Sequence, residues 1–546
     1  MEVLTTWLKP IKSIGGRDPL GVRMPSEIIY ADLVPGITNV TDRARYYSFY
    51  PWLVWAIHQQ YPSLSLDEFV RVIRRADCLF TFIAIEHQER EGRSGRHLTG
   101  LIGSQTLPKK FRERTGTSIQ LSAFTQLEES PFRYFKNRLG GLGQYYLGPL
   151  RDLRILDGDF KTGSTITPAG EQLATAFDQG VPRGAFFAAI EADVVSVETL
   201  QELTAFCPCH LTTNAAEQQA TLDLLFNREG IFYQPENHSR RATLVLMLDL
   251  VAQAEHTMRR DESLASYFRA CTYAGALSNG AAWEVTESLA ATRDGWSLYQ
   301  RNELLSIAIQ GIFHAAIEEL WELVMLENRA AFCEQFYSAF AGEIFPNDPQ
   351  VRFSVAVEKM KELLPDLKDW QNEKHEIQLG RKLLQLGSKE TTHESRVEIV
   401  RIALEILLAL AARNKSASLP NHYFIDEAAI RAYPINLFTF RENADGLWRD
   451  KPLQELLRWL VTEWGLDAHL RVALRKLRLE GLDTFRIKPL DSGLHLIASE
   501  QPAYTTPRLA QVCQMLFDVG ALAFPASTQG ITLTPLGQSL LEECRD

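Results

Sequence analysis

A phrase that occurs twice constrains the fold of this chain more than any other feature. Residues 166–174 read ITPAGEQLA, and residues 533–541 read LTPLGQSLL. The likeness continues upstream, where LRDLRIL at 150–156 aligns with LFDVGAL at 516–522. Each copy predicts a helix, a short strand, a polar loop, a second strand and a final helix. This order is typical of a winged helix, which we expect at about 122–179 and again at about 505–546.

The start of each repeated final helix follows the rules for helix N-termini. A threonine there is a good N-cap, because its side-chain oxygen accepts from the exposed N–H groups of the first turn. Proline follows at the first helical position, where its missing N–H costs nothing. A glycine two residues later allows close packing against the preceding strand. These pairs are Thr167 and Thr534, Pro168 and Pro535, and Gly170 and Gly537.

The rest of the pattern predicts a mainly α, multi-domain protein. A chain of 546 residues is too long for one ordinary core. We expect an N-terminal helical domain over 1–180, which ends in the first winged helix, and a helical middle domain over 181–415. The C-terminal domain, over 416–546, is expected to hold a helical hairpin (451–464 and 467–480), a short β-hairpin and the second winged helix.

Charge is distributed unevenly between the two copies. The net charge of −11 argues against a protein that coats nucleic acid non-specifically, but phosphate binding depends on local charge. Residues 90–138 contain ten Lys and Arg against four Glu, whereas the second copy has almost no cations. We therefore expect the first copy to contact DNA and the second to contact protein. The candidate DNA-binding residues here, interleaved with Tyr134 and Phe135, are Lys109, Lys110, Arg112, Arg133, Lys136 and Arg138.

A second basic stripe is expected on the helix at 467–480. Arg471, Arg475 and Arg478 are spaced by four and three residues, so they share one helical face. Such a stripe can follow the phosphates of a nucleic acid. The same spacing also fits the solvated face of an amphipathic helix, and the sequence leaves both readings open.

The segment Cys207-Pro-Cys209-His210 looks like half of a zinc site. A structural zinc ion needs four ligands, usually with a second pair at defined spacing. The nearby candidates, His238 and Cys271, do not form such a pair. We therefore expect reduced cysteines at a helix boundary, and no metal or other cofactor, with Cys207, Cys209 and His210 kept as weak candidates.

A second acidic and histidine-rich group lies at 86–97. Glu86 and His87 are adjacent on the helix expected over 66–91, so they point about 100° apart and do not converge on one ion. Together with Glu89 and His97 they are expected to form a charged helix end.

No catalytic motif is present in the sequence. It contains no GxxxxGK phosphate loop, no GxSxG nucleophile elbow and no HExxH helix, so we do not expect an enzyme. A nuclease with an unrecognised fold is the remaining catalytic alternative. The first residues lack a basic region followed by an apolar run, no long apolar run is free of charge, and seven scattered cysteines predict no disulfide framework. A cytoplasmic protein without membrane contact is expected.

Two blocks resemble a family. PGITNVTDRARYYSFYPWL at 35–53 is similar to the N-terminal block of uncharacterised bacterial proteins, and so is HLRVALRKLRLEGLDTF at 469–485. Genes of such proteins lie near restriction and phage-defence genes, so the resemblance implies context rather than chemistry. Physically, Asp42, Arg43 and Arg45 predict a buried ion pair that holds the N-terminal helix. A stacking and phosphate site is the alternative.

Taken together, these patterns predict a non-catalytic subunit that binds DNA or acts as an adaptor. Its expected assembly is a bacterial anti-phage defence or DNA-processing complex. Double-stranded DNA is one expected partner, and a motor ATPase or nuclease encoded nearby is another. The alternative is a pure protein–protein scaffold that docks such a partner through its winged helices.

Overall fold

The computed structural model describes residues 18–92, 97–114, 116–126, 134–157, 165–254, 262–323, 325–345, 350–414, 426–524 and 530–544. The described part is mainly helical, as predicted. The chain divides into two compact units, and neither is a continuous stretch. The first unit comprises Met1–Asp32, Ser266–Glu284 and Ala290–Thr505, and the second comprises Leu33–Ala265, Val285–Leu289 and Thr506–Asp546. This division differs from three consecutive domains because the last segment packs with residues from the first half of the chain.

The second unit has an unusually aromatic core helix. Helix α2 (Tyr46–Gln60) is buried from Tyr46 to Leu53, and it packs against α6 (Pro168–Asp178). Pro51 lies inside α2 and does not end it. Proline removes one helical hydrogen bond. Buried rings before and after it, including Phe49 and Trp52, keep the helix continuous through packing.

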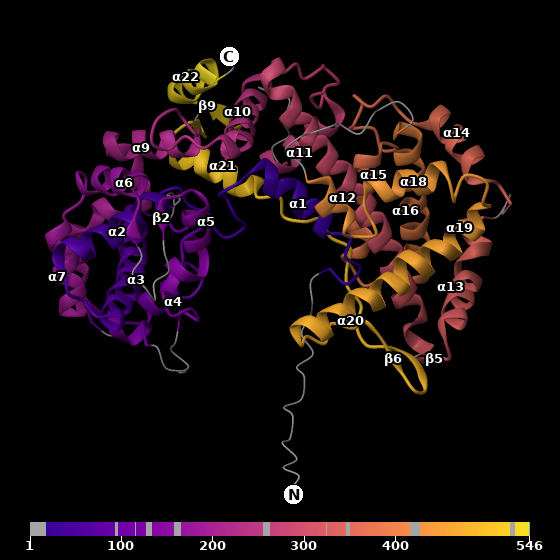
Figure 1. The fold of residues 1–546 in the computed structure, drawn as a ribbon, viewed down its shortest axis with the longest axis horizontal. Helices are drawn as coiled ribbons and strands as arrows, with labels where there is room; N and C mark the ends of the chain where they lie inside the picture. The colour runs from indigo at the N-terminus through magenta and orange to yellow at the C-terminus, as the bar shows by residue number, and fades with distance from the viewer. Residues whose placement is uncertain are drawn as a thin grey trace, which may run out of the picture. The chain divides into compact units, whose positions relative to one another are not determined.

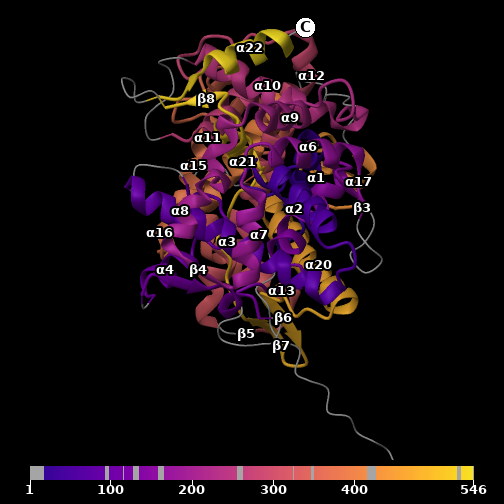
Figure 2. The same ribbon diagram turned by 90° about the vertical axis from the view of Figure 1, so that its left-hand side faces the viewer.

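Helix α3 (Leu66–Glu91) has the bounds that its apolar spacing predicts. Ser65 caps it, with Glu68 completing a reciprocal capping box. Figures 1 and 2 show α2, α3 and α7 close together in this unit. The other helices of the unit are α4 (Leu107–Arg112), η1 (Leu121–Phe124), η2 (Leu142–Tyr146), α5 (Leu147–Asp152), α7 (Arg183–Ala192), α8 (Val197–Glu202), η3 (Thr204–Phe206), η4 (Pro208–Thr213), α9 (Ala215–Leu225), η5 (Pro235–Asn237), α10 (His238–Gln253), α21 (Leu509–Asp518) and α22 (Pro535–Cys544).

Three antiparallel strand pairs complete the second unit. Strand β1 (Ser118–Gln120) pairs with β4 (Val194–Ser196). The other two pairs belong to the repeat: β2 (Leu156–Asp157) with β3 (Thr165–Ile166), and β8 (Leu522–Ala523) with β9 (Thr532–Leu533). The loops within these two hairpins, at 158–164 and 525–529, lie outside the described residues.

The two copies of the repeat have the same local structure. Thr167 Oγ1 accepts from Gly170 N at 3.1 Å, and Thr534 Oγ1 accepts from Gly537 N at 3.0 Å, so both predicted caps are confirmed. A Cβ on either glycine would come within 2.3 or 2.1 Å of a carbonyl oxygen of the residue before the first strand. Each copy thus consists of a helix, a hairpin whose two strands are two residues long, and a capped helix packed tightly on that hairpin.

The first unit consists mostly of helices. Helices α13, α14, α16, α18 and α19 lie together in Figure 1. The elements of the unit are α1 (Met24–Leu33), α11 (Leu264–Ala274), α12 (Glu287–Leu320), η6 (Trp321–Leu323), α13 (Arg329–Ile344), α14 (Phe353–Leu363), α15 (Glu376–Gly387), α16 (His393–Asn414), α17 (Glu427–Arg431), α18 (Leu437–Asp445), α19 (Leu453–Trp459), η7 (Leu460–Asp467), α20 (Ala468–Glu480), and the strands β5 (Met325–Leu326), β6 (Ile487–Leu490) and β7 (Gly493–Leu496).

The helix pair expected in the C-terminal part is one continuous helical path. Helix α19 passes through the π-helical segment η7 into α20, and the residues at both junctions keep right-handed helical dihedrals. Gly465 lies within η7 and does not end the helix. The predicted β-hairpin is confirmed: β6 pairs with β7, and β5 adds a third strand on the other edge of β7.

One helix of the described chain is long and apolar enough to cross a membrane. It runs over Glu287–Leu323, and 83% of its most apolar window is buried inside the protein. Such burial is typical of a core helix, because a spanning helix would present its apolar side chains to lipid.

Candidate nucleic-acid interface

Helix α20 carries an exposed row of arginines. Arg471, Arg475 and Arg478 are all exposed, and a rotation of about 100° per residue places them within about 60° around the helix axis. Leu474 and Leu479, which flank this row, are 52% and 73% exposed. We call these five residues the α20 face. It combines positive charge with apolar side chains that are more than half exposed.

The opposite side of α20 is fixed by a buried histidine. His469 Nδ1 donates to the carbonyl oxygen of Pro19 at 3.2 Å, and its Nε2 accepts from the backbone N–H groups of Arg486 at 2.9 Å and Ile487 at 3.1 Å. Burial lowers the pKa of His469 to about 4, so the ring is neutral at pH 7. Helix α20 therefore has a rigid base, and Gly481 ends it in a left-handed conformation with φ of 66°.

The arginines of the α20 face are not neutralised by carboxylates. Among the described residues, no Asp or Glu forms an ion pair with Arg471, Arg475 or Arg478, and Arg475 lies 5.7 Å from the centre of the Tyr433 ring. Arg431, which is also exposed in this unit, differs because it pairs with Glu427 and with a second carboxylate. Uncompensated guanidinium groups on one helical face suit an anionic partner.

The basic region of the second unit is largely paired. Lys109 and Lys110 on α4 both lie near Glu113, at 3.8 and 3.4 Å, and exposed Arg138 pairs with Asp67. Arg112 is exposed and donates to the carbonyl oxygen of Pro108. Surface pairs of this kind are weak, so the side chains stay accessible to a competing phosphate. Of the remaining candidates, Lys136 is exposed and Arg133 lies outside the described residues.

Phe135, one of the aromatic residues of this region, is buried and offers no stacking surface to a base. Phe135 is 1% exposed, and the Arg74 guanidinium lies 5.3 Å from its ring centre. Arg74 also donates to the backbone carbonyl oxygens of Thr125 and Asn137. The guanidinium therefore holds Thr125 and Asn137 in place from inside the unit.

The helices that precede the two hairpins differ in exposure. Helix α5 of the first copy leaves Gly148, Arg151 and Asp152 exposed, whereas on α21 of the second copy only Ala510 is exposed. Helix α5 therefore has more exposed residues than α21, although it is the shorter of the two helices.

Arg43 and Arg45 form the buried ion pairs that we favoured over a phosphate site. Arg43 Nε lies 2.8 Å from Asp518 Oδ2, and Arg45 makes two 3.0 Å contacts with Glu217. All four side chains are at most 4% exposed. Asp42, in contrast, accepts from the side chain of Gln511 at 2.8 Å.

The structure places Cys207, Cys209 and His210 beside His87, which we had assigned to a charged helix end. Cys209 Sγ lies 3.5 Å from His87 Nδ1 and 3.2 Å from His210 Nδ1. The neighbouring Cys207 thiol and the imidazoles lower the pKa of Cys209, whereas burial raises the pKa of Cys207. Spacing along the sequence missed His87 because it lies on α3, far from the cysteines. His238 and Cys271, the companions that sequence proximity suggested, are not part of this group.

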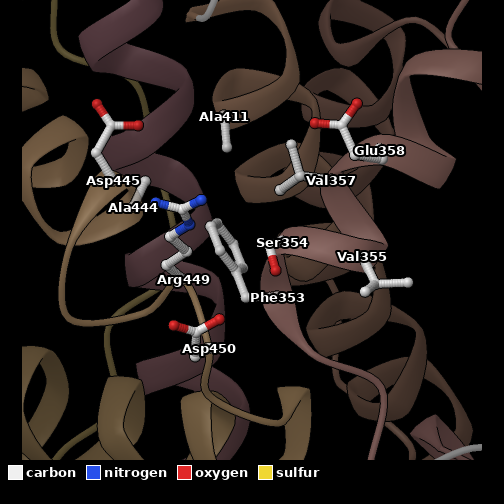
Figure 3. Close-up of a pocket in the computed structure, with 10 residues that line it drawn as sticks. All are labelled: Phe353, Ser354, Val355, Val357, Glu358, Ala411, Ala444, Asp445, Arg449 and Asp450. Atoms are coloured by element: carbon white, nitrogen blue, oxygen red, sulfur yellow. The ribbon is translucent and has the colours of Figure 1, made fainter.

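A cavity of about 680 Å³ lies in the first unit, between α14, α16 and the connection that follows α18. Figure 3 shows the residues that line it. Three carboxylates, from Glu358, Asp445 and Asp450, line it with the single guanidinium of Arg449. Excess negative charge makes it unsuitable for phosphate. No histidine or cysteine is among the lining residues, so the cavity offers Ser354 no imidazole as a general base.

Comparisons with known proteins give no relative from which a function could be inferred, so the assignment of function rests on the side chains of this protein. The chain matches no family model, no curated protein and no solved structure. The family resemblance of the blocks at 35–53 and 469–485 therefore stays a prediction.

Proposed function

We propose that this protein is a non-catalytic subunit that binds double-stranded DNA through the α20 face. The observation that carries this proposal is the row formed by Arg471, Arg475 and Arg478, exposed and without carboxylate partners among the described residues. Arginine binds phosphate oxygens through a planar fork of donors and is more weakly hydrated than lysine. A row about 10 Å long, from 471 to 478, can contact successive phosphates of one strand.

The repeat supports the same proposal. According to this proposal, both copies of the repeat are winged helices. The first copy contacts the duplex through the exposed side of α5. The cations that flank this contact are Lys109, Lys110, Arg112, Lys136 and Arg138. Pairing with Glu113 and Asp67 weakens these cations as primary contacts, so their role in the proposal is secondary to that of the α20 face. The cellular context suggested by the family resemblance is an anti-phage defence or DNA-processing assembly with a motor ATPase or nuclease.

The test measures the binding of double-stranded DNA by fluorescence anisotropy over a range of salt concentrations. The variant R471A/R475A/R478A should bind more weakly, and its plot of log K against log salt should flatten by roughly 0.9 for each lost phosphate contact. The matched control is R431A/R441A, which removes exposed arginines of the same unit that already have carboxylate partners. Equal affinity of the triple variant and the wild type would contradict the proposal.

A scaffold function is the second candidate, and one observation favours it. Phe524, which follows β8 in the second copy, is 49% exposed and stacks on Phe517 with ring centres 4.6 Å apart. Exposed aromatic residues are typical anchors of protein interfaces. If F524S abolishes co-purification with the products of adjacent genes while the wild type shows no salt-sensitive DNA binding, the scaffold function replaces the first proposal.

A further inference from the structure

Four side chains with metal-binding atoms converge in the second unit. We call His87, Cys207, Cys209 and His210 the Cys₂His₂ cluster. One ligand atom from each lies within 4.8 Å of the ligand atoms of the other three. His87 comes from the end of α3, Cys207 lies between η3 and η4, and Cys209 and His210 lie in η4. Two segments that are 120 residues apart along the chain therefore supply one compact set of donors.

The spacing of the donors matches a tetrahedral zinc site. With Zn–S of ~2.3 Å and Zn–N of ~2.0 Å, the N···S edges of a tetrahedron are ~3.5 Å long. The two measured edges from Cys209 Sγ, to His87 Nδ1 and His210 Nδ1, are 3.5 and 3.2 Å. Small movements of side chains alone would complete the coordination shell.

Glu91 orients the imidazole of His87. Its carboxylate accepts from His87 Nε2 at 2.7 Å, and its other oxygen accepts from His97 Nε2 at 3.0 Å. When Nε2 carries the proton, Nδ1 has its lone pair free and directed toward the sulfurs. A carboxylate behind a ligand histidine is the usual outer partner in zinc sites, because it fixes the tautomer and raises the basicity of the ligand. His97 Nδ1 lies 3.3 Å from Cys207 Sγ, so His97 supports the cluster from beside it.

The turn that carries the cysteines is held in place independently of any metal. Arg45 Nη1 donates to the carbonyl oxygens of Ala205, at 2.8 Å, and of Cys207. The guanidinium is anchored by both oxygens of Glu217, which also accepts from Ser48 at 2.7 Å. The cluster is therefore built into a rigid scaffold, which distinguishes it from a chance meeting of polar side chains.

We propose that the Cys₂His₂ cluster binds a single zinc ion as a closed structural site. Two thiolates and two neutral imidazoles exactly balance the charge of Zn²⁺, which favours the ion where His87 and Cys207 are buried. On binding, each cysteine that holds a proton releases it to solvent. Four protein ligands leave no open position for a substrate, so the ion joins the end of α3 to the start of η4 and the residue before it. Thiolate and imidazole ligands in tetrahedral geometry select zinc over magnesium or calcium.

The test is metal analysis of the purified full-length protein. The wild type should contain one zinc per chain, whereas C209S and H87A should contain much less than one. C333S and H393A change a half-buried cysteine and a histidine of the first unit and should keep the full content. H97A should keep the stoichiometry but lose zinc to a chelator at a lower chelator concentration, because it removes a supporting contact and no ligand.

A second measurement covers the case in which ligand variants fail to fold. Wild-type protein stripped by a chelator and then given Co²⁺ should take up one ion per chain and show thiolate-to-cobalt charge-transfer absorption with tetrahedral ligand-field bands. Absence of zinc from the wild type together with no such absorption on adding Co²⁺ would overturn the proposal. Equal zinc content in C209S and C333S would also overturn it. Neither outcome depends on DNA binding.

Discussion

Arg43 Nε lies 2.8 Å from Asp518 Oδ2, although the two residues are 475 positions apart in the chain. The same oxygen accepts from the backbone N–H of Ala44 at 2.9 Å, and Gln514 donates to the other oxygen. The pair is almost completely buried, so each charge depends on the other for its solvation. This contact fastens the last segment of the chain to the start of α2.

Replacing Asp518 with alanine should strongly destabilise the second unit. The change leaves the Arg43 guanidinium buried without its carboxylate, which costs about 3–5 kcal/mol in comparable proteins. Urea unfolding followed by tryptophan fluorescence measures the effect. Asp67→Ala is the control, because it breaks an exposed pair with Arg138 and should cost less than about 1 kcal/mol. Similar losses in both variants would show that burial does not govern the Arg43 pair.

The glycines of the repeat should tolerate no side chain. Gly170→Ala and Gly537→Ala each place a Cβ within 2.3 Å of a backbone carbonyl oxygen, so each hairpin must move away from its helix. We expect a loss of about 1–3 kcal/mol for each, seen as a lower midpoint of thermal unfolding. Gly342→Ala on α13 meets no atom within 4 Å and should be neutral or stabilising by up to about 1 kcal/mol. A loss in Gly342→Ala as large as in the repeat would contradict this account.

His469 should make the first unit sensitive to acid. Burial lowers its folded pKa to about 4, below the unfolded value of about 6.5. His469 makes its full contribution to the free energy of unfolding above pH 6.5. This contribution is lost as the pH falls toward 4, at up to about 1.4 kcal/mol per pH unit. Protonation places a hydrogen on Nε2, which then no longer accepts from the N–H groups of Arg486 and Ile487.

Hydrogen exchange checks this prediction at residue level. Once corrected for intrinsic rates, exchange at the amides of Arg486 and Ile487 should accelerate in the wild type between pH 6 and 4.5. In His469→Gln, which does not titrate, protection of these amides should not change over that range. Parallel behaviour of the two proteins would refute the role of His469.

Asp77 should have the opposite pH dependence. Burial raises its pKa to about 7, while Tyr50 and the backbone N–H of Gly141 donate to its two oxygens at 2.7 and 2.8 Å. Because the folded pKa lies above the unfolded value, the contribution of Asp77 to stability is complete below about pH 4 and is lost as the pH rises to 7. The difference in unfolding free energy between wild type and Asp77→Asn should therefore decrease from pH 5 to pH 7. A difference that is constant with pH would rule out this titration.

Sequence patterns predicted local structure well and distant partners poorly. The bounds of α3, the threonine caps and the paired strands of the repeat follow from spacing and capping chemistry, which act within a few residues. Burial of Arg43 could be inferred from its aromatic neighbours. Its partner could not, because nothing near Asp518 in the sequence distinguishes it from a solvated aspartate.

The Cys₂His₂ cluster shows the same limit. Cys207, Cys209 and His210 were recognised as half of a site, and His87 was discarded because its neighbour Glu86 points elsewhere on the helix. Spacing rules compare residues within one segment, so they do not detect a ligand on a helix 120 residues earlier. Glu86 indeed does not join the cluster, since it accepts from Gln201 instead.

The second unit is assembled from three separate segments of the chain, which has a consequence for biosynthesis. Its segment Thr506–Asp546 includes Asp518 and the whole second copy of the repeat, and a ribosome makes this segment after every residue of the first unit. Until this segment is made, Arg43 in the nascent chain lacks its partner Asp518. The groups that α21 and α22 cover in the folded unit also lack their partners. The first unit, in contrast, already has all its residues. The second unit thus begins to be made early and finishes folding late, and this interval is when a chaperone, or a partner bound during translation, would have the most to protect.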